Sequence, residues 1–335
     1  MVEAPGLKLA LKRGALMAAA NWPLVAVQFL AESTLKLLLT VSVAGGVFLV
    51  VLALDAEVET ILSADIEAVI AAILGTLRQN PIALAAFVLS FLVVLIGASM
   101  LTFIVKSGTV SLLADADGTT GPIERAPLRL RTLRRADRTA IEPFLDACRR
   151  FGPRYVKLGM CLLLVYAATA FGYSRFFLAG YARADDVSPL LVLVWIGVMV
   201  VVTGALLVWI LLVNVFYLLT QMVIAVEDVG VQQALAGVWR FVRTSLRELA
   251  GIFGVVLVLV LAAIAASFLA MGALGLISWV PILALTVMPL QIATWLLRGL
   301  VFQFLALTAL GAYLTQYRFY RRGATLSAVP GQRLA

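Results

Sequence analysis

A few polar residues lie inside long apolar runs of the sequence, and their types and spacing limit the chemistry available to the chain. Glu32 and Lys36 are four residues apart, which places them on one helical face in the favourable order for an ion pair. Arg298, Lys106 and Asn214 lie in other apolar runs. A charge at the bilayer centre costs ~2.5–3.5 kcal/mol on insertion scales. We therefore predict an intramembrane polar cluster, which either fixes helix packing or lines a path for a solute, an ion or a lipid headgroup.

Residue types that carry most known catalytic chemistry are missing. The chain has no histidine, which excludes Ser-His-Asp and Cys-His nucleophile systems, HExxH zinc sites and histidine-ligated haem. Cys148 and Cys161 lack the CxxC spacing of a metal site. The adjacent acids at 185–186 and 227–228 point in different directions on a helix, so neither forms a convincing acid/base pair. We predict no enzymatic activity, no catalytic residue, no cofactor and no metal ligand.

The composition indicates the elements that hold these residues. Of 335 residues, 63% are hydrophobic and 13% are charged, whereas a soluble domain is about 45–50% apolar and ~25% charged. The sequence thus predicts an all-α polytopic transmembrane bundle in a single membrane domain, 1–335, with two stretches, 14–54 and 187–226, that are each long enough for two short spans. The six predicted spans are 22–54, 81–112, 155–177, 189–219, 250–272 and 290–316.

Basic residues predict the orientation. With six spans, most of the 26 lysines and arginines fall in segments on one side, which the positive-inside rule assigns to the cytoplasm. Both termini are then cytoplasmic in a plasma (bacterial inner) membrane. The net charge of +8 follows from this orientation, and we expect no nucleic-acid partner.

The segments between the spans include amphipathic stretches. We predict an acidic helix within 55–80 on the outer surface, and a basic cytoplasmic loop at 114–138 that contains a surface turn at 115–121. Two further helices are expected in the headgroup plane: one near 141–151, with Ile141, Phe144, Leu145, Cys148 and Phe151 on its apolar face, and one near 231–249, with Val231, Leu235, Val238, Trp239, Val242, Leu246 and Leu249. The predicted partners are the lipid bilayer and its anionic headgroups, contacted by Arg134, Arg135, Arg138, Arg149, Arg150, Arg240 and Arg243.

The order of these elements suggests a three-part repeat. An interfacial helix precedes the first, third and fifth spans, and each is followed by a hairpin of two spans. The units are 1–113, 139–226 and 230–322. Because residue identity between the units is low, the repeat is a hypothesis from pattern.

One stretch resembles a known family. Met222-Val223-Ile224-Ala225-Val226-Glu227-Asp228-Val229-Gly230, followed by Ala234 and Trp239-Arg240-Phe241-Val242-Arg243, is similar to a motif in the membrane domain fused to some glycerophosphodiester phosphodiesterases and in related free-standing bacterial membrane proteins. The motif covers 222–247 and departs at 237–238, where a polar Arg-Ser pair is expected. The resemblance implies about six spans with amphipathic helices between pairs. The hydrolytic domain has no counterpart here, so the activity is not implied.

The sequence leaves two functions open. We expect a non-enzymatic membrane scaffold or accessory protein, because no catalytic constellation and no large soluble segment is present. The alternative is a transporter or channel that uses the buried Glu/Lys/Arg cluster. A water-accessible cavity at Glu32 and Arg298 would favour transport, and a dry, packed centre would favour the structural role.

Overall fold

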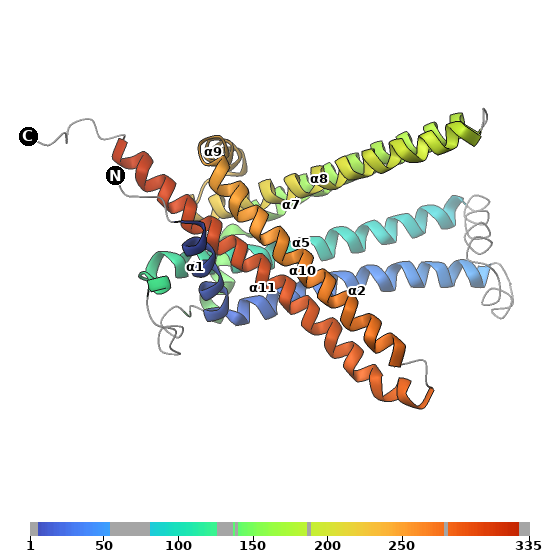
Figure 1. The fold of residues 1–335 in the computed structure, drawn as a ribbon, viewed down its shortest axis with the longest axis horizontal. Coiled ribbons are helices and arrows are strands. Elements are labelled where there is room, and N and C mark those ends of the chain that lie inside the picture. The colour runs from blue at the N-terminus through green and yellow to red at the C-terminus, as the bar shows by residue number, and fades with distance from the viewer. Residues whose placement is uncertain are drawn as a thin grey trace, which may run out of the picture.

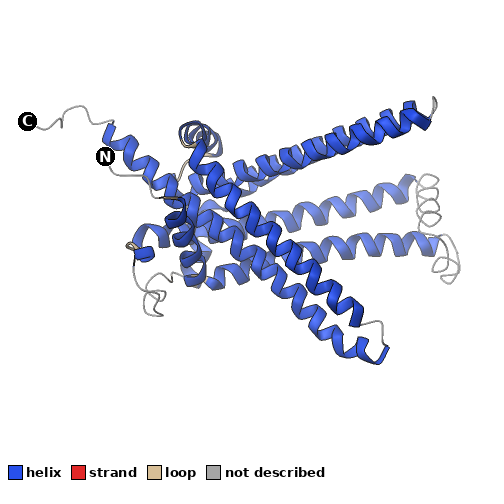
Figure 2. Cartoon of the chain, in the orientation of Figure 1, coloured by secondary structure: helices blue, strands red, loops and turns tan. Residues whose placement is uncertain are grey.

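The computed structural model describes residues 6–53, 81–125, 137, 140–185, 189–277 and 281–327, and the regular elements within them are all helical (Figure 2). A bilayer offers no hydrogen-bond partners, so spanning segments satisfy their backbone groups within helices. The helices are α1 (Leu7–Ala20), α2 (Trp22–Ala53), α5 (Pro81–Thr119), η1 (Ile123–Arg125), α7 (Ile141–Asp185), α8 (Pro189–Glu227), α9 (Val231–Thr244), α10 (Leu246–Ile277) and α11 (Pro281–Ser327).

Among the described residues, six helices are long and apolar enough to cross a membrane, as predicted. They are α2, α5, α7, α8, α10 and α11. The chain is therefore a multi-pass membrane protein. Both stretches that could have held two short spans contain one uninterrupted long helix, α2 in the first and α8 in the second.

The spanning helices pack in consecutive pairs, α2 with α5, α7 with α8 and α10 with α11. Figure 1 shows that the three pairs meet at one end, where α1 and α9 cross them, and diverge toward the other end. We call these the packed end and the open end. The largest fully buried side chains at the packed end include Tyr155, Met222, Phe241, Leu314 and Tyr317. The start of α1 and the end of α11 both lie at the packed end, as an even number of crossings requires.

α7 differs from its prediction. The expected surface helix at 141–151 is the first part of α7, which continues through Pro153 into the span. Gly108 of α5 makes room for this first part of α7, because a Cβ there would lie 2.6 Å from Cys148 Sγ and 2.7 Å from the Phe144 ring. The space left by this glycine lets α7 pack against α5, so Phe144 turns inward while Ile141 is exposed.

α9 is a separate helix, as predicted, but its inward face is rotated. Val231, Ala234, Val238 and Phe241 are buried on α9, whereas Trp239 is 51% exposed. Packing against α8 and α10 selects this face, and the Phe241 ring also packs against Tyr317 and Tyr320 of α11.

The start of the predicted loop 114–138 is also helical. α5 continues to Thr119, so the predicted surface turn at 115–121 is wrong for its first part. The rest of that loop at 126–136 and the predicted outer helix within 55–80 lie outside the described residues.

α1 and α9 each have 14 residues and are each followed, after one non-helical residue, by a spanning helix. α7 has no such break, and the three-part repeat stays a prediction.

α1 and α11 approach each other closely at two glycines. A Cβ on Gly14 would lie 2.2 Å from the Thr308 carbonyl oxygen and 2.8 Å from the Ala312 nitrogen. A Cβ on Gly311 would lie 2.8 Å from the Gly14 Cα atom. The backbones therefore touch where no side chain fits, as small residues permit in membrane proteins.

Replacement of Gly14 by alanine should destabilise the protein, because the atoms that its Cβ would meet belong to the α11 backbone and cannot rotate away. We expect a loss of about 1–3 kcal/mol, typical of overpacking, in SDS-induced unfolding in mixed micelles. Gly254→Ala on α10 is the matched control, since a Cβ there meets nothing within 4 Å. Equal stability of the two variants would contradict the close approach.

Candidate functional site

All six spanning helices line one central cavity of about 550 Å³. Its polar lining comes from Gln28 and Glu32 on α2, Lys106 on α5, Tyr166 on α7, Asn214, Tyr217 and Gln221 on α8, and Gln303 and Tyr313 on α11. α10 contributes Phe253 and Val256. A cavity to which every span contributes can be assembled only when the whole bundle folds.

The predicted cluster is partly assembled in this cavity, with a different pairing. Glu32 Oε1 lies 3.5 Å from Lys106 Nζ. The sequence predicted Lys36 as the ion-pair partner of Glu32. The packing of α2 on α5 brings Lys106 to Glu32 instead. Both side chains are about three-quarters buried, so each partly neutralises the other where water is scarce.

Asn214 belongs to the same cavity, where its side chain is held by two hydrogen bonds. The Tyr166 hydroxyl donates to Asn214 Oδ1 at 2.8 Å, and Asn214 Nδ2 donates to the Ile210 carbonyl at 2.9 Å. The first of these bonds joins α7 to α8 across the cavity wall. Asn214 therefore orients one side of the lining.

Two other lining residues carry buried polar atoms that have no hydrogen-bond partner within the described part of the chain. These atoms are Gln28 Oε1 and Gln303 Oε1, whereas Tyr217 and Gln221, which are one helical turn apart on α8, are placed to hydrogen-bond to each other. The Gln28 and Gln303 side chains are each more than nine-tenths buried. An unpaired polar atom in the membrane interior costs free energy, about 1–3 kcal/mol in proteins, so these atoms favour a polar occupant.

Gln28 and Gln303 were not among the predicted site residues. One signal in the sequence could have found Gln28, since it precedes Glu32 by one helical turn and shares its face. Asn214, Tyr217 and Gln221 likewise follow one face of α8. Gln303 has no such neighbour, because its companions come from other helices.

A second cavity of about 320 Å³ lies between α2 and α11 and shares Glu32 and Gln303 with the first. Lys36 and Arg298 line it, so the structure brings Glu32, Lys36 and Arg298 to one site. Arg298 stacks over the Phe302 ring at 5.6 Å. Neither Lys36 nor Arg298 forms an ion pair with a described residue. These two cations stand one helical turn or more beyond Glu32 and Gln303 toward the open end.

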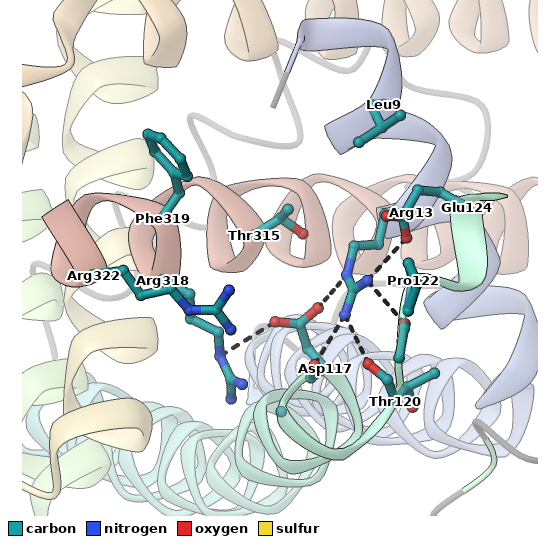
Figure 3. Close-up of a pocket in the computed structure, with 12 residues that line it drawn as sticks. Leu9, Arg13, Asp117, Thr120, Pro122, Glu124, Thr315, Arg318, Phe319 and Arg322 are labelled. Carbon is teal, nitrogen blue, oxygen red and sulfur yellow. Dashed lines mark hydrogen bonds and ion pairs between the residues drawn. The ribbon is translucent and has the colours of Figure 1, made fainter. Parts of the chain in front are cut away.

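At the packed end, a buried carboxylate joins three helices (Figure 3). Asp117 of α5 accepts from Arg13 Nε of α1 at 2.6 Å, and its other oxygen lies 3.2 Å from Arg318 Nε of α11. Arg13 also donates to Glu124 Oε2 at 2.9 Å and to the carbonyls of Asp117, Gly121 and Thr120. The sequence treated Asp117 as part of a turn and Arg13 as an orientation signal, so it missed this network.

The five N–H donors of Arg13 are thus all engaged, which a planar guanidinium can do and an ammonium cannot. Burial by itself would lower the pKa of Arg13. The charge and hydrogen bond of Asp117, followed by those of Glu124, raise this pKa above its usual value. Arg13 therefore remains charged, and it keeps Asp117 compensated at the packed end.

The junction between α8 and α9 is held by ion pairs as well. Asp228, whose φ is 53°, accepts from both Arg150 and Arg154 of α7. These hydrogen bonds lower the pKa of Asp228. Glu227 accepts from the Tyr317 hydroxyl at 2.5 Å. The motif residues 227–228 therefore tie α8 to α7 and α11 rather than forming an acid/base pair.

The predicted headgroup residues divide into three groups. Arg150 is engaged by Asp228, and Arg243 stacks on the Trp239 ring at 4.6 Å. Arg149 and Arg240 are exposed at the packed end. Arg134, Arg135 and Arg138 lie outside the described residues. Contact with lipid headgroups stays a prediction for all of them.

Cys148 and Cys161 are free thiols. Within the described part of the chain, no group of three or more cysteines and carboxylates gathers closely enough to hold a metal ion. No family model, no curated protein and no solved structure matches the chain. The resemblance over 222–247 thus stays a prediction, and the site must be interpreted from its own geometry.

Replacement of Asp117 by asparagine should weaken the packed end, because it leaves Arg13 and Arg318 facing a neutral amide. We expect a loss of about 3–5 kcal/mol, the range for breaking a buried pair, in SDS-induced unfolding. Arg13→Lys should lose much of the same stability, since lysine cannot make the five bonds. Lys8→Gln is the control, an exposed basic residue of the same helix. Full stability of R13K would refute the role of the guanidinium geometry.

A double-mutant cycle tests the Glu32–Lys106 pair. Glu32→Gln and Lys106→Gln should each destabilise the bundle, whereas the double variant should recover part of the loss, with a coupling energy of about 0.5–3 kcal/mol. The measurement is the free energy of unfolding in mixed micelles. Glu32→Gln combined with Lys36→Gln is the matched comparison, and stronger coupling in that cycle would favour the partner predicted from sequence.

Proposed function

We propose that the chain is a non-enzymatic multi-pass membrane protein that binds a polar or amphipathic solute in its central cavity, as a transporter or carrier does. The observation that carries this proposal is the polar lining that the spanning helices contribute to one cavity, which includes Gln28 and Gln303, whose buried side-chain oxygens have no partner among the described residues. A solute or water that entered between these side chains would satisfy the two oxygens. The proposal therefore favours the polar path over the scaffold that the sequence suggested first.

The charged residues of the two cavities also favour a binding site over a purely structural network. A network that served packing alone would pair its members, as Glu32 and Lys106 are paired. Lys36 and Arg298 instead face a cavity without an acidic partner among the described residues. Glu32 is the one carboxylate among the described residues of both linings, whereas general acid/base catalysis commonly uses a second titratable group. Binding thus fits the lining better than catalysis.

The packed end is proposed to face the cytoplasm of a plasma (inner) membrane. Lys12, Arg13, Arg149, Arg240 and Arg318 lie there, and the positive-inside rule assigns such a concentration of basic residues to the cytoplasmic side. Both chain ends are then cytoplasmic. The membrane architecture that the 222–247 motif implies is part of the same proposal.

Thiol labelling tests whether the cavity contains water. In a Cys148→Ser, Cys161→Ser background, Gln303→Cys should react with a water-soluble thiol reagent at least about tenfold faster than Val301→Cys. The thiolate is the reactive form and needs water to ionise. Val301 is the matched control, because it lies on the same helix at nearly the same depth but is exposed toward lipid. Equal, slow labelling of both would indicate a dry centre and refute the proposal in favour of the scaffold.

A further inference from the structure

We propose that the solute is an anionic amphiphile of the phospholipid type, whose phosphate lies at Lys36 and Arg298 and whose chains leave the cavity between α8 and α10. This inference rests on the proposed function, and it names the class of ligand and its route of entry.

The wall of the central cavity contains both polar and apolar residues. α2 and α5 contribute Gln28, Glu32 and Lys106, and α11 adds Gln303. α10 lines the cavity with Phe253 and Val256, and α8 adds Leu211, Val215 and Leu218 beside its polar Asn214, Tyr217 and Gln221. A small polar solute would leave these apolar residues poorly matched. A molecule with one polar and one apolar part matches both kinds of residue.

The helix packing leaves an opening beside these apolar residues. α2 packs on α5 and α11, α5 packs on α7 and α8, and α10 packs on α11. Within the described residues, α8 and α10 make no extensive contact with each other. α9 packs on both of them at the packed end, and beyond it α8 and α10 diverge (Figure 1). The cavity is thus bordered there by two separated helices that face the bilayer.

The occupant of such an opening follows from its location. Side chains of α8 and α10 outside the cavity are exposed and apolar, for example Leu212, Val258 and Leu261, so the opening leads into the hydrocarbon region. The molecules available there are lipids. Their chains can remain between α8 and α10 while a headgroup enters the cavity.

The charges select the headgroup. The Glu32–Lys106 pair is neutral as a unit, whereas Lys36 and Arg298 add two positive charges to the adjoining cavity. An unpaired cation in a medium of low dielectric is stabilised by a nearby anion. Arginine binds phosphate oxygens through two parallel hydrogen bonds, and lysine adds a point charge. A phosphate beside Gln303 and Glu32 would compensate both cations.

Native mass spectrometry of the full chain in detergent tests this inference. The probes are phosphatidylglycerol, phosphatidylcholine with the same acyl chains, and glycerol 3-phosphate, which has the phosphate without chains. We expect phosphatidylglycerol to bind at least about tenfold more tightly than either of the others. The double variant Lys36→Gln, Arg298→Gln should lower its affinity to that of phosphatidylcholine, whereas Lys8→Gln, an exposed basic control, should leave it unchanged.

The entry route has its own matched pair of variants. Val256→Trp should fill the opening from α10 and weaken binding of the lipid about tenfold, while Val258→Trp, two residues along the same helix and exposed, should not. Val215→Phe fills the same opening from α8 and replaces V256W if that variant is not monodisperse.

The outcomes separate this inference from the proposed function. Equal binding of the two phospholipids, or an affinity unchanged by the loss of Lys36 and Arg298, overturns the assignment of the phosphate. Binding of glycerol 3-phosphate as tight as that of phosphatidylglycerol, with no effect of V256W, overturns the lipid and its lateral route but leaves a solute-binding cavity. If no probe binds and Gln303→Cys is not labelled, both proposals are wrong.

Discussion

Asp117 joins three helices that are far apart in the sequence, and the arrangement of the bundle depends on this buried carboxylate. It accepts from Arg13 of α1 and pairs with Arg318 of α11. An isolated carboxylate at this site would be strongly unfavourable, so α1, α5 and α11 are stable there only together. The α2–α5 and α10–α11 pairs are thereby fastened at one end, and the hydrogen bond from Tyr317 of α11 to Glu227 of α8 attaches the α7–α8 pair to them. Because no comparable network joins the described residues at the open end, the pairs can diverge and leave the polar cavity between them.

Close backbone packing complements this electrostatic attachment. Gly14 and Gly311 bring α1 against α11, and Gly108 admits Cys148 and Phe144 between α5 and α7. Lipid chains are as apolar as leucine, so helix association in a membrane depends on such contacts and on polar pairing. The polar residues of the cavity supply no comparable packing. The packed end thus combines close backbone contacts with buried ion pairs.

The six spans could be predicted from sequence because hydropathy and length are local properties, and all six are present. The Glu32, Lys36 and Arg298 cluster was also found, since a charge in an apolar run needs no further context to be noticed. The partner of each charge was not predictable. Lys106 meets Glu32 and Arg13 meets Asp117 only through the packing of different helices. The packing of the first part of α7 depends on Gly108, which belongs to another helix.

Attachment at one end also determines how the cavity can change. α8 has 39 residues, which corresponds to a length of ~58 Å. A rotation of about 5° at the packed end would move its far end by ~5 Å, several times the displacement near the ion pairs. The Arg150, Arg154 and Asp228 contacts lie close to that pivot, where α9 links α8 to α10. Residues outside the cavity lining therefore help to set the separation of α8 and α10, because these helices are joined through α9 at the packed end.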